Sequence, residues 1–398
     1  MSKTDASRLA KLNARFPTIE ALREHARRHA PRFAFEYADG GAGNDSGILR
    51  NRRALDSFEM LPRYGASEST STAVNLFGRQ YAAPVGISPM GTPSLAMPGA
   101  DILLARAAQA ARIPYVLSAI GGATIEDVAT EAGDVFWFQI VPSQSEDHTV
   151  EDDLLRRAES AGAHVLILTI DVPVYTPRPR ASQVGLGGST FRPSARMIRD
   201  IATSPLWLSS LIRHGVPRFA SLRRYMAPGA SLDDTIAFAQ RELGGPFRWA
   251  DLARFRERWK RPLVVKGILS PEDAERAISL GVDGIVVSNH GGRQVDALPA
   301  SIDCLADIAK VVAGRATLML DSGVRSGSDV VRALALGASA AFAGKAFLWS
   351  LCALGDEGPS HALRLFQSET QAVMSQLGIG SVDDCKRIVV RKTGGPGA

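Results

Sequence analysis

Residues 284–294 read Gly-Ile-Val-Val-Ser-Asn-His-Gly-Gly-Arg-Gln, a short apolar run that ends in a cluster of polar side chains. The run is continuous rather than alternating, which is typical of a strand buried on both faces. Seven similar runs recur along the chain, at Ala83–Ser88, Tyr115–Ser118, Val135–Gln139, His164–Thr169, Pro262–Lys266, Ala316–Asp321 and Ser339–Ala343. Eight buried strands alternating with helix-like stretches favour an α/β fold, a closed parallel (β/α)8 (TIM) barrel, over an open sheet.

Helix starts follow several of these runs. Thr124 and Ser231 each precede acidic residues in an expected first turn, and Ser270 precedes a proline that suits the first helical position. We expect helices to begin at these three points.

The 398 residues are predicted to form one domain, 1–398, with a helical N-terminal segment and a barrel core at about 83–355. The interval between the fourth and fifth strands is much longer than the others. This insertion occupies about 176–260, and loops of such length usually carry function.

Composition narrows the class of protein. Hydrophobic residues make up 45% and charged residues 22%, which is globular, and a net charge of +5 does not by itself imply nucleic acid. Three cysteines without a CxxC pair argue against a disulfide framework or a thiolate metal site. The N-terminus lacks the apolar core of a secretion signal, and the longest apolar stretch, 339–355, contains Lys345. We therefore expect a cytoplasmic location and no metal.

Polar side chains follow the apolar runs where each predicted strand ends. They are Ser118, Gln139, Thr169 with Asp171, Lys266, Ser288 with His290, Asp321 and Lys345. The carboxyl ends of barrel strands converge on one face, so we expect these side chains to form one site.

Three segments carry chemistry. His290 and Arg293 place a base and a carboxylate-binding fork three residues apart. Lys266 ends a buried strand, where an ammonium needs an anionic partner. Asp321-Ser-Gly323-Val-Arg325 and Ala343-Gly344-Lys345 follow strands seven and eight, where barrels commonly bind phosphate.

Taken in order, these segments resemble the FMN-dependent α-hydroxy-acid oxidases and dehydrogenases, the family of glycolate oxidase and of lactate and mandelate dehydrogenases. The likeness runs from about Phe33 to Ile388. It is greatest to the bacterial L-lactate dehydrogenase branch, through Phe35-Glu-Tyr37-Ala-Asp-Gly-Gly-Ala and the long fourth loop.

The resemblance implies oxidation of an L-2-hydroxy acid to the 2-oxo acid, with electrons passed to a quinone, a cytochrome or O2. His290 would be the base and Asp171 its orienting acid, while Tyr37, Arg178 and Arg293 would bind the substrate carboxylate. The implied FMN contacts are Met90, Gly91, Ser118, Gln139, Thr169, Lys266, Ser288, Asp321, Gly323, Arg325, Gly344 and Lys345. A homotetramer or octamer is also implied.

The chain departs from the family pattern at four positions. Val141 stands where the family usually has a tyrosine that points at the substrate, and Ile120 replaces a tryptophan of glycolate oxidase. Met90 has no hydroxyl to offer, and Lys345 replaces a phosphate-binding arginine. The first two changes indicate a less polar pocket for a larger or aromatic side chain.

The same residues are also compatible with other functions. An FMN barrel with changed chemistry, an FMN carrier, or oxidation of a hydroxy acid on a larger scaffold would suit the loss of the tyrosine at Val141. A flavin-dependent isopentenyl diphosphate isomerase would have no use for a carboxylate clamp of Arg178 and Arg293. We set nucleic-acid binding aside, because the basic residues lie in one loop.

That basic loop lies in the insertion. Residues 176–230 contain nine arginines, no lysine and one acid, Asp200, around an apolar stretch with a tryptophan, Ser204–Ile212. Basic residues beside exposed Trp and Leu are typical of a segment on anionic lipid, which predicts peripheral membrane contact through 176–230. The interpretation favoured over it is a mobile lid over the active site, whose apolar residues pack onto the barrel or a neighbouring subunit.

Overall fold

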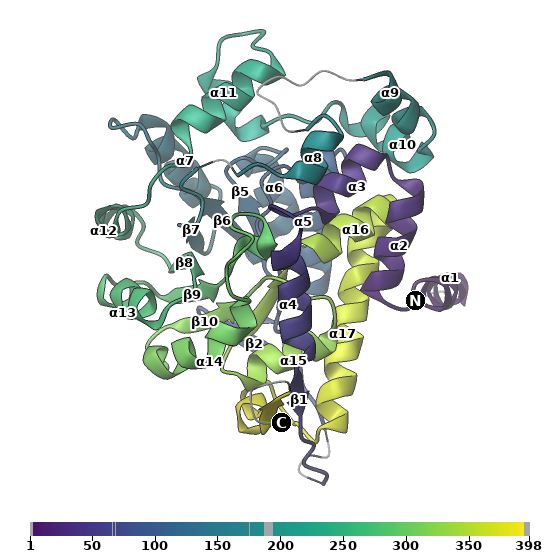
Figure 1. Cartoon of the computed structure of the whole chain (residues 1–398), viewed down its shortest axis with the longest axis vertical. Coiled ribbons are helices and arrows are strands. Elements are labelled where there is room, and N and C mark those ends of the chain that lie inside the picture. Colours follow the sequence, from purple (N-terminus) through teal and green to yellow (C-terminus); the bar gives the residue numbers. More distant parts are fainter. Residues whose placement is uncertain (1–2, 66, 68, 175, 187–193, 394–398) are drawn as a thin grey trace.

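The computed structural model describes residues 3–65, 67, 69–174, 176–186 and 194–393. Eight parallel strands close into a barrel in the order β10-β11-β4-β5-β6-β7-β8-β9, which confirms the predicted fold (Figure 1). The strands are β4 (Val85–Ile87), β5 (Tyr115–Ser118), β6 (Phe136–Ile140), β7 (Leu166–Thr169), β8 (Leu263–Ile268), β9 (Gly284–Val287), β10 (Thr317–Leu320) and β11 (Ala340–Ala343). Each lies within the predicted run or extends one or two residues beyond it.

Helices surround the barrel. Most of them connect successive strands, and the last two follow the final barrel strand. They are α5 (Ala100–Ala111), α6 (Ile125–Ala132), α7 (Thr149–Ser160), α13 (Pro271–Ser279), α14 (Ser301–Val312), α15 (Gly327–Ala335), α16 (Lys345–Leu354) and α17 (Gly358–Gln376). The predicted starts are confirmed: Thr124 and Ser270 accept hydrogen bonds from the backbone N–H groups of their first turns, as N-caps do.

A short hairpin covers the amino-terminal end of the barrel. β2 (Val74–Leu76) and β3 (Arg79–Tyr81) pair antiparallel, and Tyr81 accepts a 2.9 Å hydrogen bond from the indole of Trp137 inside the barrel. Gly86 is required there, since a Cβ on it would lie 2.3 Å from the ring of Phe342. The interior is therefore filled with aromatic side chains at this end, and the site must lie at the other.

The N-terminal segment is helical, as predicted. It comprises α1 (Lys3–Arg15), α2 (Ile19–His29), α3 (Arg32–Asp39) and α4 (Ser46–Asp56), and α2 packs along α16 (Figure 1). β1 (Phe58–Met60) then pairs antiparallel with β12 (Val390–Lys392), so the C-terminal strand is held beside the segment that enters the barrel.

The insertion between β7 and β8 forms α8 (Pro179–Gln183), α9 (Ala195–Ala202), α10 (Pro205–His214), the 3-10 helix η3 (Ala220–Tyr225), α11 (Leu232–Glu242) and α12 (Trp249–Arg258). Ser231 and Asp234 form the predicted capping box of α11. Figure 1 shows α9 and α10 beside α3, with α11 on the opposite side of the same end. Of the helices in the described ranges, none is long and apolar enough to cross a membrane.

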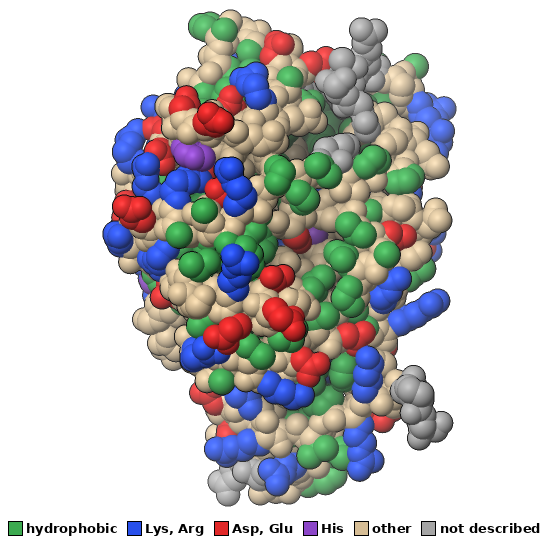
Figure 2. Space-filling model, turned by 60° about the vertical axis from the view of Figure 1, so that its left-hand side comes forward, with side chains coloured by type: hydrophobic (Ala, Val, Ile, Leu, Met, Phe, Trp, Pro, Cys, Tyr) green, Lys and Arg blue, Asp and Glu red, His purple; other side chains and the backbone are tan. Residues whose placement is uncertain are grey.

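The lipid interpretation expected Trp207 to be exposed, and in this respect it is wrong. Its side chain is 4% exposed, and its ring packs edge-on against Phe33 of α3 at 5.3 Å. The exposed apolar side chains of α9 and α10 are instead Ile198, Leu206 and Ile212. Acidic and basic side chains are intermixed over the face shown in Figure 2.

Candidate active site

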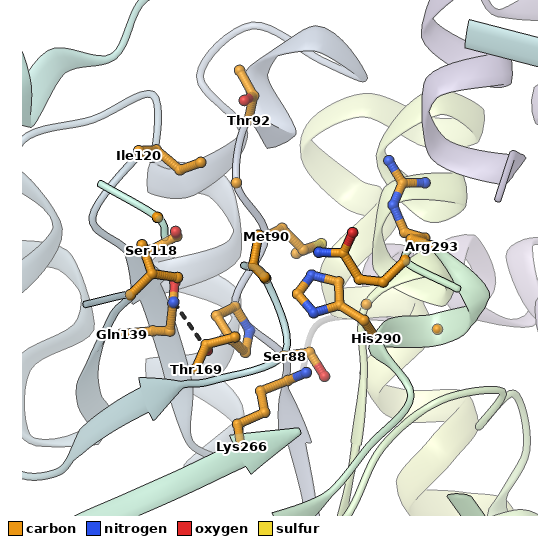
Figure 3. Close-up of a pocket in the computed structure, with 18 of the residues that line it drawn as sticks. Ser88, Met90, Thr92, Ser118, Ile120, Gln139, Thr169, Lys266, His290 and Arg293 are labelled. Carbon is orange, nitrogen blue, oxygen red and sulfur yellow. Dashed lines mark hydrogen bonds between the residues drawn. The ribbon is translucent and has the colours of Figure 1, made fainter. Parts of the chain in front are cut away.

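A cavity of about 700 Å³ opens at the carboxyl ends of the barrel strands. Figure 3 shows side chains from several strand ends facing this space. Its walls include most of the residues predicted for the site: Tyr37, Met90, Gly91, Ser118, Gln139, Thr169, Arg178, Lys266, His290, Arg293, Asp321, Gly323, Arg325, Gly344 and Lys345. Asp171 and Ser288 are the two exceptions, and both lie behind the wall.

His290 faces the cavity and is held from behind by Asp171. The Nδ1 atom of His290 lies 3.0 Å from Oδ1 of Asp171, so the carboxylate accepts from Nδ1–H and leaves Nε2 able to take a proton. Burial works to raise the pKa of Asp171, but His290 and Lys266 outweigh it and hold that pKa below its usual value. The carboxylate therefore stays charged and fixes the ring.

Lys266 is buried and lies at the floor of the cavity. Its ammonium lies 3.1 Å from Oδ2 of Asp321 and donates a 2.8 Å hydrogen bond to Ser288. The hydroxyl of Ser288 also accepts from the backbone N–H of His290 at 3.0 Å. Ser288 thus joins the lysine to the histidine loop, although it was predicted to contact the cofactor itself.

The other side of the cavity carries neutral polar groups. The amide of Gln139 donates a 3.0 Å hydrogen bond to the hydroxyl of Thr169 (Figure 3), and Ser118 stands at the end of the neighbouring strand. Backbone of Met90 and Gly91 follows β4 across from them. These strand ends offer donors and acceptors to the edge of a flat polar ring.

The loops after β10 and β11 contribute two half-buried cations. Lys345 donates hydrogen bonds to the carbonyls of Asp39 and Gly40 at 2.7 and 2.8 Å, and burial with Arg293 nearby lowers its pKa well below the usual value. Arg325 pairs with Glu20 at 3.1 Å, and burial lowers its pKa too. A dianion bound between them would favour both charged forms.

The three predicted carboxylate ligands lie at the rim. Arg178 has a buried Nε atom without a hydrogen-bond partner among the described residues. The hydroxyl of Tyr37 accepts from the backbone N–H of Thr92 at 3.2 Å, which leaves its own hydrogen for another acceptor. Arg293 lies over the ring of Tyr37 and donates to the Tyr37 and Gly40 carbonyls.

Several wall residues were not predicted. The insertion adds apolar side chains from α11 and from the residues directly before η3 and directly after α11, and α4 adds an asparagine: Phe219, Ile236, Ala239, Leu243 and Asn51. Asn51 exchanges two amide hydrogen bonds, 2.9 and 2.7 Å, with Asn289. Nothing in the sequence signals such a contact, whereas the capping box at Ser231 did mark where α11 begins.

The residues present fit an FMN. The cavity combines a polar-edged slot at Gln139 and Thr169, a buried ammonium at Lys266, and two half-buried cations where a phosphate would lie. The partnerless Nε of Arg178 further indicates that an anionic ligand completes this site.

Comparison with known proteins agrees with this geometry. A model of the family described as FMN-dependent dehydrogenase matches residues 26–392. The L-lactate dehydrogenase of Caulobacter sp. (strain K31) is 37% identical over 94% of this chain and 97% of that protein. That of Pseudomonas syringae pv. syringae (strain B728a) is 34% identical, over 93% and 97%.

Solved structures give the same result. A crystal structure of (S)-mandelate dehydrogenase, a monotopic membrane protein, superposes with a TM-score of 0.87 at 31% identity, covering 94% of this chain and 99% of that one. Mandelate oxidase superposes with a TM-score of 0.80 at 31% identity, covering 95% and 99%.

Fold and site thus define a flavin-binding (β/α)8 barrel enzyme. The chain belongs to the FMN-dependent dehydrogenase family, as its motifs predicted. It is an oxidoreductase, and FMN is its cofactor.

Proposed function

We propose that this enzyme oxidises an L-2-hydroxy acid to the corresponding 2-oxo acid. The observation that carries the proposal is the placement of Arg178, with its partnerless Nε, and the His290–Asp171 pair, 3.0 Å apart, at one cavity. An anion-binding group and an oriented base are the two things this oxidation requires. The names of the relatives, lactate and mandelate dehydrogenases, support the same class of substrate.

In the proposed reaction Arg178, Arg293 and Tyr37 bind the substrate carboxylate and orient the hydroxyl-bearing carbon. His290 takes a proton from the substrate at Nε2, and Asp171 stabilises the imidazolium that results. FMN, when bound, would accept the two electrons and the second hydrogen that leave the substrate. Lys266 supplies a fixed cation where negative charge accumulates during that transfer, and Ser288 holds this lysine in place.

The substrate side chain is proposed to be apolar and larger than a methyl group. Val141 and Ile120 line the cavity at positions where relatives carry larger polar rings, and α11 adds Ile236 and Leu243 to the same wall. Such a wall favours an aromatic or branched side chain over that of lactate.

The proposed electron acceptor is a quinone or cytochrome at a membrane surface. Ile198 and Ile212 of α9 and α10 are 58% and 79% exposed, and Arg196 and Arg199 lie beside them in α9. Exposed apolar side chains with arginines nearby in the chain suit shallow binding to anionic lipid. The helices of the insertion therefore have two proposed roles, with η3 and α11 as the wall of the site and α9 and α10 as the lipid contact.

The test is an anaerobic titration of the yellow protein with L-lactate, L-mandelate and longer 2-hydroxy acids. Bleaching of the flavin absorbance by one of them, most readily by the aromatic acid, is the expected result. Reoxidation by a quinone much faster than by air would support the proposed acceptor. A flavin that none of these acids bleaches would contradict the proposal and favour the changed chemistry suggested by Val141.

A further inference from the structure

One arginine outside the cavity joins two segments that carry proposed substrate ligands. Arg180, in α8, contacts three carboxylates of the N-terminal segment: Glu36 at 2.6 Å, Asp39 at 2.9 Å and Asp45 at 2.7 Å. Arg180 is not part of the cavity wall, so it does not touch the ligand. We call this group of four residues the Arg180 cluster.

The Arg180 cluster joins the two segments of the chain that carry the proposed carboxylate ligands Arg178 and Tyr37. Arg178 precedes Arg180 by two residues at the start of α8, and Tyr37 lies between Glu36 and Asp39 at the end of α3. These segments are far apart in sequence, and the ion pairs hold α8 against α3. The relative position of Arg178 and Tyr37 therefore depends on the cluster.

The segment that carries Tyr37 is held from its other side as well. Arg23 of α2 donates to both carboxylate oxygens of Asp39, at 2.6 and 3.1 Å. Arg293 donates to the carbonyl of Tyr37, and Lys345 to those of Asp39 and Gly40. Since α2 and the barrel already hold this segment, Arg180 provides the additional contact that connects it to the insertion.

Charge explains why the cluster needs its arginine. Burial works to lower the pKa of Arg180, but Asp45, Asp39 and Glu36 outweigh it and raise that pKa above its usual value. Without the guanidinium, three carboxylates would face one another with Arg23 and Lys345 left to balance them. We expect them to separate and α8 to shift, which moves Arg178 away from Tyr37.

We propose that Arg180 is a positioning residue that fixes the spacing of the two carboxylate ligands, Arg178 and Tyr37. This inference rests on the proposed function, because it assumes that both side chains bind a substrate carboxylate. A displacement of about 1 Å in such a site costs on the order of 100-fold in rate or affinity. The loss should therefore appear in substrate binding and not in the content of FMN.

The experiment compares Arg180→Gln and Arg180→Lys with wild type, all as holoenzymes. The probes are L-mandelate, for KM and kcat, and its product benzoylformate, whose Kd follows from the change in flavin absorbance on binding. Arg180→Gln is expected to raise KM and Kd about 10- to 100-fold while kcat changes less than threefold. Arg180→Lys keeps the charge without the fork and should fall in between.

The matched control is Arg27→Gln, which removes an exposed arginine paired with Glu24 on α2 and should leave both constants unchanged. A double variant tests the route of the effect. If Arg180 acts by placing Arg178, then Arg178→Gln with Arg180→Gln binds benzoylformate no more weakly than Arg178→Gln alone. Asp45→Asn, which weakens the cluster without removing the arginine, provides the readout if Arg180→Gln fails to fold.

The inference would be overturned if Arg180→Gln had the KM and Kd of wild type. It would also be overturned if the double variant lost as much affinity for benzoylformate as the two single variants together. A wild-type protein that neither L-mandelate nor another 2-hydroxy acid reduces would instead overturn the proposed function, and the inference with it.

Discussion

His290 adopts a backbone conformation that most side chains avoid. Its φ is +58°, in the left-handed region, and the turn around it is held by hydrogen bonds from the N–H of His290 to Ser288 and from the N–H of Gly291 to Ser322. The loop thereby turns the imidazole toward the cavity and Asp171. Strain of this kind is tolerated where surrounding contacts determine the conformation.

The choice of substitution at His290 follows from that conformation. His290→Asn should lower the rate of flavin reduction by L-mandelate about 10²- to 10⁴-fold, since asparagine tolerates positive φ but cannot act as the base. FMN content and thermal stability should stay near wild type. Stopped-flow absorbance under anaerobic conditions measures the rate, and reduction at the wild-type rate would remove His290 from the mechanism.

Lys345 offers a second test at the residue scale, because it replaces an arginine expected for a phosphate contact. Lys345→Met should weaken FMN binding about 10- to 100-fold, the loss expected for one charged hydrogen bond of about 1.5–3 kcal/mol. Lys345→Arg should retain or improve binding. Fluorescence titration of the apoprotein with FMN gives both constants, and equal values for the three proteins would place the phosphate elsewhere.

At the scale of elements, the eight barrel strands could be predicted because each is a continuous apolar run with polar residues at its end. β2 and β3 could not, since three-residue strands with ordinary side chains leave no periodic signal. The pairing of β1 with β12 could not be predicted either, because it joins segments from opposite ends of the chain. The site residues at the strand ends could be predicted from the sequence. Those supplied by α4 and by the residue after α11 could not, as Asn51 and Leu243 show.

The first turn of α5 contains a buried carboxyl whose ionisation is costly. Asp101 accepts hydrogen bonds from the Tyr115 hydroxyl and the Gly122 N–H at 2.9 and 2.7 Å, yet burial raises its pKa to about 6. The folded protein therefore binds a proton that the unfolded chain has released between about pH 4 and pH 6. Stability should fall as the pH rises through this window.

Asp101→Asn should abolish that part of the pH dependence. Relative to the variant, wild type should lose about 2 kcal/mol of unfolding free energy between pH 4 and pH 6, because the pKa differs by about two units and the folded carboxyl is still half protonated at pH 6. Urea denaturation at several pH values measures both proteins. Parallel curves would show that Asp101 titrates normally.

At the scale of the whole molecule, the sequence left the burial of Trp207 open, because it shows an apolar residue among arginines but not the helix that covers it. Phe33 of α3 supplies that cover. The side chains left outside, Ile198 and Ile212, are unremarkable in sequence and become visible as a surface only after α9 and α10 are placed.

This surface makes a prediction about lipid. Wild type should co-sediment with phosphatidylglycerol vesicles, less so with phosphatidylcholine, and release should increase with salt. Ile198→Gln with Ile212→Gln should weaken binding more than tenfold, as each buried isoleucine contributes about 1.5–3 kcal/mol. Val389→Gln, at a site 54% exposed and outside the insertion, is the matched control. Equal sedimentation of the two variants would contradict the proposed contact.

The closure of the barrel has a consequence for how the protein is made. β11 pairs with β4, with Ala343 opposite Ile87, so the first barrel strand finds its second neighbour only after most of the chain has left the ribosome. Until then the nascent sheet has an unpaired edge, which is a site for aggregation. The loops with Arg325 and Lys345 also emerge late. Loading of the flavin is therefore expected to follow the synthesis of these loops.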